Sequence, residues 1–354
     1  MGVGQSGHQW RVGQADVVSV AAAFGLILAS PDLEPLGGAT NGVVRIVTGL
    51  GDLVVRVHAT WTTPDRLAAV HAVQAHLRRH GLPVPAAMTA RDGRSWATVD
   101  GRLAEVLPFV ASGHQAEDWA DAGTAVAALG RLHVAPRTFA GDVPPPAQGC
   151  YLDSTQAMDL LAATDAPFRS RATEPGFSDA ARVRSDVEAL LGHLVTARAT
   201  YHDAVPRHLV HGDLFGSNVL LSGDRVVAIL DFDRLSVRPR VHDLAYGLFH
   251  LLNRFRIVGL SPREGDGGLV NGDHLRLAGL LGRYAEADSP LTPVELAALP
   301  YEMTLAPLYP VVAAGTNAGR AVADTLGAAG QITLARWMAA SAERVTATLS
   351  DAPR

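Results

Sequence analysis

The chain of 354 residues has a single cysteine, Cys150, and no lysine. One thiol excludes an intramolecular disulfide and a cysteine-rich metal site. Because all 30 basic residues are arginines, no lysine can pair with the phosphates of a nucleotide. Arginine can take that role, since its planar guanidinium binds phosphate through two N–H groups at once, although with a different geometry.

Strong charge and long apolar runs are also missing. The net charge of −5 gives no basic footprint for nucleic acid. The longest apolar stretch near the N-terminus, Val17 to Ala29, is interrupted by Ser19 and Gly25 and is too short to span a membrane. Residues 1–11 lack the apolar core of a signal peptide. With 48% hydrophobic and 18% charged residues, the chain has the composition of a globular enzyme, and we expect it in the cytoplasm.

The most informative segment begins at His211 and has the pattern His-Gly-Asp-x₄-Asn, which places Asp213 five positions before Asn218. A predicted β-hairpin with a Ser-Gly-Asp turn at residues 222–224 leads from there to Asp-Phe-Asp at residues 231–233. Phosphoryl transfer needs a carboxylate that orients and deprotonates a hydroxyl, and hard oxygen ligands for Mg²⁺ on a nucleotide. The same Asp-x₄-Asn spacing occurs in the protein-kinase catalytic loop. The structural alternative is a hairpin whose polar residues only cap turns.

This pattern resembles the signature of the aminoglycoside phosphotransferase/choline kinase superfamily, HGD-x₄-N followed by a D-F/W-D/E segment. The resemblance is sharp over residues 209–245, moderate over 33–57, and extends over nearly the whole chain. It implies an α+β, two-lobed protein-kinase-like fold. Residues 1–107 would form a small β-rich, nucleotide-binding lobe, and residues 108–354 a larger, mostly helical lobe with the catalytic loop and acceptor pocket. The implied cofactors are ATP or GTP and Mg²⁺, and the implied partner is a small-molecule hydroxyl substrate.

The resemblance assigns roles to the motif residues. Asp213 corresponds to the catalytic aspartate, which aims and deprotonates the acceptor hydroxyl. His211 belongs to the same catalytic loop, and we expect its ring to tie that loop to neighbouring backbone rather than to transfer a proton. Asn218 and Asp231 correspond to the Mg²⁺ ligands, since amide and carboxylate oxygens are hard donors.

Two further aspartates follow the expected metal ligands. Asp233 has two interpretations: it reaches a second ion or a substrate amine, or it is a turn residue next to Arg234. Asp243 corresponds to an aspartate that braces the catalytic loop from within the helical lobe. As an acid at a helix N-terminus it would also be favoured by the helix dipole.

The nucleotide is expected to bind mainly to the N-terminal lobe. The glycine-rich turn at residues 36–42 lies between two β-like runs and can bring backbone N–H groups close to phosphates. It lacks the Gly-Lys-Ser/Thr end of a Walker loop. Arg56 takes the strand position of the family's phosphate-binding lysine or arginine; its alternative is a solvated arginine on the outer face. Residues 107–110, the expected hinge between the two lobes, would contact the nucleotide base through their backbone. Backbone contacts leave ATP and GTP undistinguished. The predicted nucleotide-binding residues are Gly37, Gly38, Thr40, Asn41, Arg56, Leu107 and Val110.

One departure from the family concerns the helix that follows Arg56. The family usually has a glutamate there that pairs with the basic residue, but residues 66–80 contain no acid. Val70 stands where this glutamate would align. We expect Gln74 or His71 to substitute for it, or the nucleotide alone to hold Arg56.

Hydrophobic periodicity and turn residues predict the remaining elements. Strands are expected in residues 33–47, 52–58, 95–99 and 102–106. Helices are expected in residues 16–28, 64–80, 117–133, 180–203, 241–255, 274–287, 293–314 and 332–349. Residues 136–149 are expected to form a loop. The glycine-rich residues 261–273 form either a mobile lid or a disordered loop.

The acceptor pocket is expected in the helical lobe, where residues 301–349 contain few acids. A polycationic sugar would need many carboxylates, so this favours an amino alcohol, a homoserine-like metabolite, a sugar derivative or a macrolide-like antibiotic. In the alternative, these helices are core and the pocket acids lie elsewhere. The acids in residues 301–349 are Glu302, Asp324 and Glu343, the large aromatics there are Tyr301, Tyr309 and Trp337, and the alternative pocket acids are Glu117, Asp118, Asp121 and Asp153.

The sequence therefore predicts a Mg²⁺- and nucleotide-dependent kinase that phosphorylates a small-molecule hydroxyl. A non-catalytic nucleotide-binding regulatory module on the same fold is the alternative. The missing helix glutamate motivates it, whereas the intact Asp213, Asn218 and Asp231 oppose it. The HGD form and the lack of an Ala-Pro-Glu motif after Asp231 disfavour a protein kinase. Oligomeric state, and a role in antibiotic resistance or in metabolism, stay open.

Overall fold

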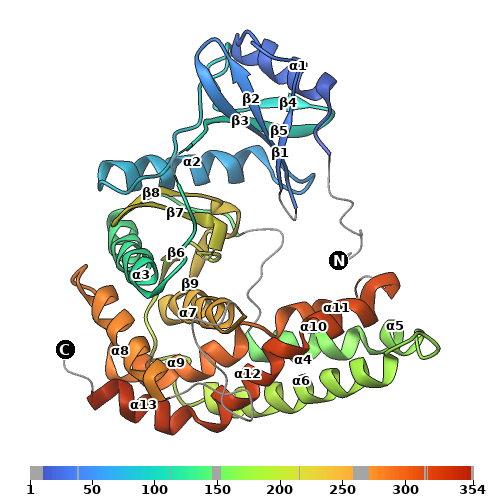
Figure 1. The fold of residues 1–354 in the computed structure, drawn as a ribbon, viewed down its shortest axis with the longest axis vertical. Coiled ribbons are helices and arrows are strands. Elements are labelled where there is room, and N and C mark those ends of the chain that lie inside the picture. The colour runs from blue at the N-terminus through green and yellow to red at the C-terminus, as the bar shows by residue number, and fades with distance from the viewer. Residues whose placement is uncertain are drawn as a thin grey trace.

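The computed structural model describes residues 11–37, 40–111, 113–145, 153–214, 216–257, 271–314, 316 and 318–351. Figure 1 shows a β-rich part at the N-terminal end of the chain and a larger helical part below it. The α+β architecture predicted from the sequence is confirmed. No helix in the described ranges has the length and apolarity needed to cross a membrane.

The β-rich part is a five-stranded antiparallel sheet with strand order β1-β2-β3-β5-β4. Runs of β-branched residues favour its central strands. Val44 and Ile46 of β2 and Val55 and Val57 of β3 face one apolar core, which helix α1 closes from above. The bounds are α1 Gln14–Phe24, β1 Glu34–Gly37, β2 Gly42–Thr48, β3 Gly51–Val57, β4 Ala97–Val99 and β5 Arg102–Pro108.

Helix α2 (Pro64–Arg79) lies between this sheet and the helical part (Figure 1). Thr63 caps its first turn by accepting a hydrogen bond from the Arg66 N–H at 3.2 Å, and Pro64 occupies the first helical turn. Its buried face, which includes Val70 and Leu77, packs in the hydrophobic core of the helical part. Consequently α2 follows β3 in sequence but belongs to the second core.

The motif loops are held by two small antiparallel pairs inside the helical part. Strand β6 (Arg207–Val210) pairs with β9 (Ser236–Pro239), and β7 (Val219–Ser222) pairs with β8 (Arg225–Ile229). Strand β6 ends just before His211, and β8 ends just before Leu230. The loop that begins at His211 and the loop that carries Asp231 therefore start close to each other. The single-turn helices here are η2 Gly216–Asn218 and η3 Phe232–Arg234.

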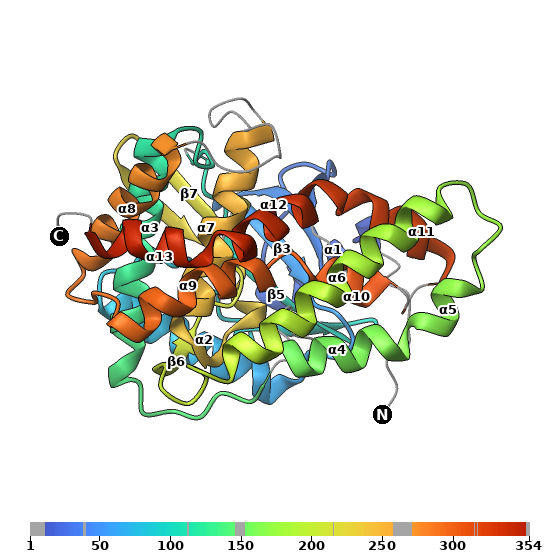
Figure 2. The same cartoon turned by 90° about the horizontal axis from the view of Figure 1, so that it is seen from below.

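The helices of the second part form two groups. Helices α3, α7, α8, α9 and α13 surround the main core, and Figure 2 shows α4, α6, α10 and α11 side by side in an arm away from it. The bounds are α3 Trp119–Val134, η1 Ala135–Thr138, α4 Ser154–Ala163, α5 Asp165–Arg169, α6 Phe177–Arg198, α7 Arg240–Ile257, α8 Asn271–Ala285, α9 Pro293–Leu305, α10 Tyr309–Ala314, η4 Ala318–Arg320, α11 Ala321–Gly327, α12 Ala329–Ala340 and α13 Ala342–Asp351.

Several predicted elements differ from the observed ones. The first helix ends at Phe24 because Gly25 takes a left-handed conformation with φ 69°. The single helix expected over 293–314 is two helices, separated at residues 306–308 where Pro307 cannot donate a backbone hydrogen bond. The helix expected over 332–349 is likewise α12 and α13, and α4, α11 and β9 had no predicted counterpart. Most of the predicted lid, residues 261–270, lies outside the described ranges.

Candidate active site

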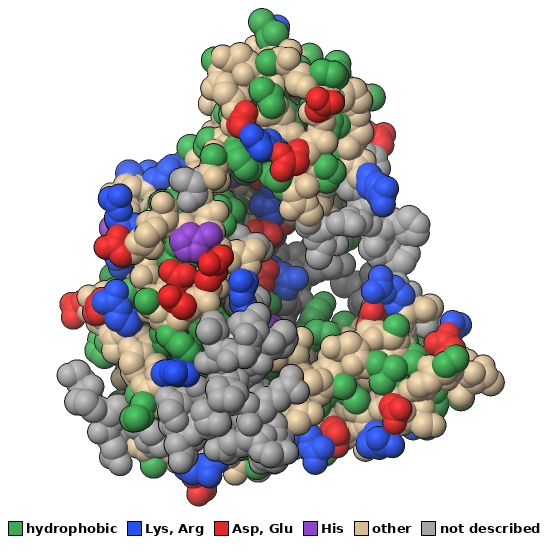
Figure 3. Space-filling model, in the orientation of Figure 1, with side chains coloured by type: hydrophobic (Ala, Val, Ile, Leu, Met, Phe, Trp, Pro, Cys, Tyr) green, Lys and Arg blue, Asp and Glu red, His purple; other side chains and the backbone are tan. Residues whose placement is uncertain are grey.

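A cleft of about 390 Å³ lies between the sheet, helix α2 and the β7–β8 hairpin. Figure 3 shows the molecule hollowed below the β-rich part, with acidic and basic side chains in the hollow. His211 and Asp243 do not line the cleft, and Gly38 lies outside the described residues. The predicted site residues that line it are Gly37, Thr40, Asn41, Arg56, Leu107, Val110, Asp213, Asn218, Asp231 and Asp233.

The loop that presents Asp213 is fixed from behind by His211. The His211 Nε2–H donates to the Leu230 carbonyl at 2.8 Å, while Nδ1 accepts the Asp213 N–H at 3.2 Å. Both bonds are made together only by the neutral ring with its proton on Nε2. Burial also lowers the pKa of His211, despite the nearby Asp243 charge, and so favours the neutral form. The His211 ring thus links the Asp213 loop to the backbone at Leu230, as expected from the sequence.

Gly212 and Asp243 complete this support. Gly212 has φ 83°, and a Cβ there would stand 2.4 Å from the Arg234 carbonyl oxygen, so that only glycine fits. Its N–H donates to Asp243 Oδ1 at 2.8 Å, and Asp243 Oδ2 lies 3.0 Å from His133 Nε2. Asp243 is also in the first turn of α7. The bracing contact and the favourable helix position are therefore both present.

The Asp213 carboxylate faces the cleft but is only 22% exposed. Its Oδ2 lies 3.6 Å from Arg234 Nε, and the Tyr246 hydroxyl donates a hydrogen bond to the carboxylate. Burial raises the pKa of Asp213 to about 7; the charges of Asp231 and Asp243 act in the same direction, and the Tyr246 bond acts against them. The raised pKa makes this carboxylate a better proton acceptor than an ordinary aspartate.

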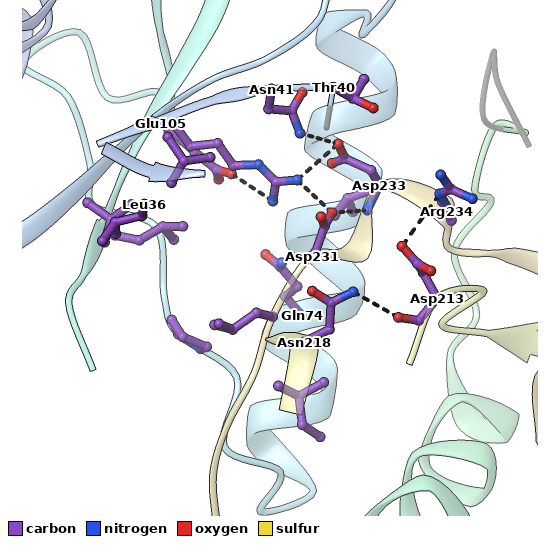
Figure 4. A pocket seen from close by; sticks show the side chains of 18 of the residues that line it. Leu36, Thr40, Asn41, Gln74, Glu105, Asp213, Asn218, Asp231, Asp233 and Arg234 are labelled. Atoms are coloured by element: carbon purple, nitrogen blue, oxygen red, sulfur yellow. Dashed lines mark hydrogen bonds and ion pairs between the residues drawn. The ribbon is translucent and has the colours of Figure 1, made fainter. Parts of the chain in front are cut away.

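Asn218 and Asp231 both line the cleft (Figure 4), and the Leu230 N–H, one residue before Asp231, donates to the Asn218 carbonyl at 2.8 Å. The Asn218 Nδ2 donates to the Asp213 carbonyl at 2.8 Å, which leaves its Oδ1 for a cation. Asp231 has φ 61°, and its Oδ1 accepts the Asp233 N–H at 3.4 Å. The described residues contain no cluster of three or more His, Cys, Asp or Glu side chains suited to a metal ion. One carboxylate and one amide oxygen fit Mg²⁺ that brings phosphate and water ligands, and not a protein-only metal site.

Arg56 is buried beneath the sheet, with a side chain only 10% exposed, so the alternative of a solvated outer-face arginine is wrong. Its Nη2 lies 2.6 Å from Asp231 Oδ1 and 2.9 Å from Asp233 Oδ2, and its Nη1 lies 3.9 Å from Glu105 Oε1. Burial opposes the positive charge, but the three carboxylates outweigh it and raise the pKa of Arg56. The same guanidinium holds the pKa of Asp231 below its usual range against the effect of burial.

Asp233 connects the two parts of the molecule and is more than a turn residue. Its Oδ2 accepts a hydrogen bond from Asn41 Nδ2 at 2.6 Å, in addition to the Arg56 ion pair (Figure 4). Asn41 Oδ1 in turn accepts the Ala59 N–H at 3.1 Å. The end of the glycine-rich turn is therefore fixed against the segment that follows the expected metal ligand.

Glu105 and Tyr246 are the site residues that the sequence interpretation missed. Glu105 is the cross-strand neighbour of Arg56 on β5, and Tyr246 lies one turn after Asp243 on α7. An acid opposite a buried arginine would have been a signal, but it needs the β3–β5 register. The spacing of Tyr246 from Asp243 was readable, since residues three apart on a helix share a face.

Three of the acids considered for the acceptor pocket, Glu302, Asp118 and Asp153, have structural partners. Glu302 is fully buried and accepts hydrogen bonds from Arg198, Tyr201 and His242. Asp118 and Asp153 cap the first turns of α3 and α4. Of the aromatic residues, Tyr301 packs on both large cores and Trp337 is buried, as the core alternative anticipated.

Comparison with known proteins places this geometry in a family. The model of the phosphotransferase enzyme family matches residues 32–280, more than half of the chain. The homoserine kinase of Zymomonas mobilis is 26% identical over 236 residues, which cover 64% of this chain and 68% of that protein. The homoserine kinase of Gluconacetobacter diazotrophicus is 28% identical over 275 residues, which cover 76% and 77%.

Solved structures of small-molecule kinases share the fold. An amicoumacin kinase in complex with AMP-PNP, Ca²⁺ and amicoumacin aligns with a TM-score of 0.65 at 16% identity over 85% of each chain. A microcompartment-associated aminopropanol kinase aligns with a TM-score of 0.56 at 18% identity, covering 93% of this chain and 97% of its own. These likenesses show that the chain shares the fold of these enzymes. From the match over residues 32–280, this chain belongs to the phosphotransferase enzyme family, as the motif had indicated, and is a kinase of the small-molecule type.

Proposed function

We propose that this protein transfers the γ-phosphoryl group of Mg²⁺-bound ATP to a hydroxyl of a small molecule. The observation that carries the proposal is the convergence of Asp213, Asn218 and Asp231 in one cleft with the buried Arg56. A base, two hard oxygen ligands and a phosphate-binding cation are the set that phosphoryl transfer uses. The regulatory module, by contrast, needs no base of raised pKa at this position.

In this proposal Asp213 accepts a hydrogen bond from the acceptor hydroxyl, aims its lone pair at the γ-phosphorus and takes its proton. Asn218 Oδ1 and Asp231 hold the Mg²⁺, which when bound neutralises phosphate charge. Arg56 binds the phosphates through its guanidinium. Gly37, Thr40 and Asn41 bring the glycine-rich turn over them.

The hinge favours ATP over GTP. Pro108 has no N–H, and the Phe109 N–H is occupied by the Asp52 carbonyl at 3.1 Å. Because the Phe109 N–H points to β3, the carbonyl of Pro108, the last residue of β5, points away from it, and we infer that the Val110 N–H does the same. An acceptor followed by a donor matches the N6 amino group and N1 of adenine. Guanine presents the opposite pair, O6 and N1–H, at those atoms.

For the acceptor we propose a hydroxyl compound with no more than one positive charge. The acids Glu302, Asp118 and Asp153 are used in a buried network and in helix caps, so they do not form a polycation site. Arg234, next to Asp213, adds positive charge beside the reacting hydroxyl. An amino alcohol with a carboxylate, such as homoserine, has this charge balance, and the relatives named homoserine kinase make it the first compound to test.

The test is ADP release with Mg-ATP and Mg-GTP across homoserine, other amino alcohols, sugars, macrolides and aminoglycosides. Asp213→Asn serves as the blank, and Asp324→Asn, which changes a half-buried acid on α11, serves as the matched control. Turnover on one class that is lost only in Asp213→Asn supports the kinase. Nucleotide binding without turnover on any acceptor favours the regulatory module, and turnover retained in Asp213→Asn refutes the assignment of the base.

A further inference from the structure

We propose that Glu105 on β5 positions Arg56 for the nucleotide phosphates, and that His71 extends this contact to helix α2. Together the two residues do the work of the acid that α2 lacks. The inference rests on the proposed function in one respect, namely that Arg56 contacts the phosphates.

The sheet register brings the acid to the arginine. Strands β3 and β5 pair antiparallel with Arg56 opposite Glu105, so their side chains emerge on the same face. That face is covered, since the Glu105 side chain is 4% exposed and the Arg56 side chain 10%. The Arg56 Nη1 lies 3.9 Å from Glu105 Oε1. The carboxylate therefore lies behind the guanidinium, on the side opposite Asp231 and Asp233 (Figure 4).

Two histidines hold the Glu105 carboxylate in place. His58 Nε2 lies 3.1 Å from Oε1, and His71 Nε2 lies 2.7 Å from Oε2. The second ring is fixed further by Ser95 Oγ, 2.6 Å from its Nδ1. These contacts, together with Arg56, keep the pKa of Glu105 far below its usual range although burial opposes ionisation. The carboxylate is thus charged and nearly immobile.

His71 carries the connection to the helix. It lies one residue after Val70 on α2, and α2 packs into the core of the helical part. In the usual arrangement of the family, a glutamate on the helix itself pairs with the basic residue. Here the charge comes from β5 and the helix supplies a neutral or cationic hydrogen-bond partner. Gln74, the other candidate substitute, has no interaction with Arg56 among those found in the described residues.

Arg56 needs the Glu105 carboxylate as an anchor, because Asp231 and Asp233 also attract its guanidinium. Its shortest contacts are with Asp231 and Asp233, which belong to the metal-binding segment. In the proposed complex Asp231 would hold the Mg²⁺ and Arg56 would contact the phosphates. Without Glu105, Arg56 would be drawn by these aspartates alone and would lie farther from the phosphates.

The experiment measures binding of Mg-AMP-PNP and of adenosine by calorimetry, so that it does not depend on turnover. Groups that orient a metal ligand cost roughly 10–100-fold in affinity when removed, and we expect Glu105→Gln to raise the Kd of AMP-PNP about tenfold. Adenosine, which has no phosphate, should bind as in the wild type. Glu302→Gln is the matched control, since Glu302 is also a buried glutamate with arginine and histidine partners but lies outside the cleft. It should leave both Kd values unchanged.

A Kd for AMP-PNP that stays within twofold in Glu105→Gln overturns the proposal, as does an equal loss for adenosine. If Glu105→Gln does not fold, His71→Phe takes its place, because it removes one hydrogen bond to the carboxylate and keeps the ring size. We then expect about a fivefold rise for AMP-PNP alone, and no rise refutes the link to α2. Absence of turnover in the wild type on every acceptor would favour the regulatory module and leave this binding comparison intact, so the two failures are distinguishable.

Discussion

Replacing Asp213 by asparagine should abolish turnover and yet stabilise the protein, and the gain should depend on pH. Asparagine has nearly the same size and can still accept the Tyr246 hydrogen bond, so the substitution mainly removes a charge. The folded protein holds this carboxylate in a buried position near Asp231 and Asp243, where its ionised form is unfavourable. The group is thus kept for its chemistry at a cost in stability.

The size of the effect follows from the pKa. The Asp213 pKa rises from an ordinary 3.8 to about 7, a difference of about 3 units, and each unit is worth about 1.4 kcal/mol. Because the folded state binds this proton more tightly, the stability that protonation contributes is fully present below pH 3.8 and is lost as the pH rises through about 7. Relative to wild type, Asp213→Asn should gain about 2 kcal/mol at pH 5.5 and about 4 kcal/mol at pH 8.

Guanidinium denaturation of both proteins at pH 5.5, 6.5 and 8 measures this difference, and titrations common to both proteins cancel. A gain that is the same at pH 5.5 and pH 8 would contradict the raised pKa. A variant less stable than wild type at pH 8 would show that the carboxylate makes a favourable contact. The same raised pKa predicts that kcat/KM of the wild type increases as the pH rises toward 7, since the base must be ionised.

Three other substitutions give separable outcomes. Gly212→Ala should lower the free energy of unfolding by about 3 kcal/mol or more, because its Cβ would meet the Arg234 carbonyl at 2.4 Å; denaturation that matches wild type would contradict this. Glu302→Ala should cost about 3–5 kcal/mol in the same assay by leaving a buried arginine and histidine unpaired, with adenosine binding unchanged. Asp231→Asn should raise the Mg²⁺ concentration needed for AMP-PNP binding about tenfold or more, and Asn218→Ala should raise it less, because only Asp231 carries charge. An equal effect of the two would refute this ranking.

The catalytic segment was readable from the sequence because its geometry is local. Asp213 and Asn218 are joined by one loop, and Asp231 follows after a hairpin whose turn residues fix its length. Short spacing leaves the chain few ways to arrange these side chains, so residue types and their order determine which atoms meet. The same reasoning located α2, whose Thr63 cap and Pro64 define its start.

Features that depend on contacts between distant segments were not readable. Glu105 comes to Arg56 only through the β3–β5 register, which joins residues separated by α2 and the β4 hairpin. In the family the acid stands in the helix that corresponds to residues 66–80, so the family pattern does not point to Glu105. Likewise β9 is a four-residue strand that exists because β6 pairs with it. Tertiary pairing, and not local propensity, determines such elements.

An arginine instead of a lysine at position 56 fits the position of Glu105 on β5. An ammonium presents its charge at a single nitrogen, whereas a guanidinium presents two terminal nitrogens in a fixed fork. Arg56 uses both, with Nη1 toward Glu105 and Nη2 toward Asp231 and Asp233. A carboxylate on β5 suits this fork, because one nitrogen can stay with Glu105 while the other exchanges aspartate for phosphate. In the proposed arrangement Glu105 takes the place of the helix acid, and α2 contributes the contact between His71 and Glu105.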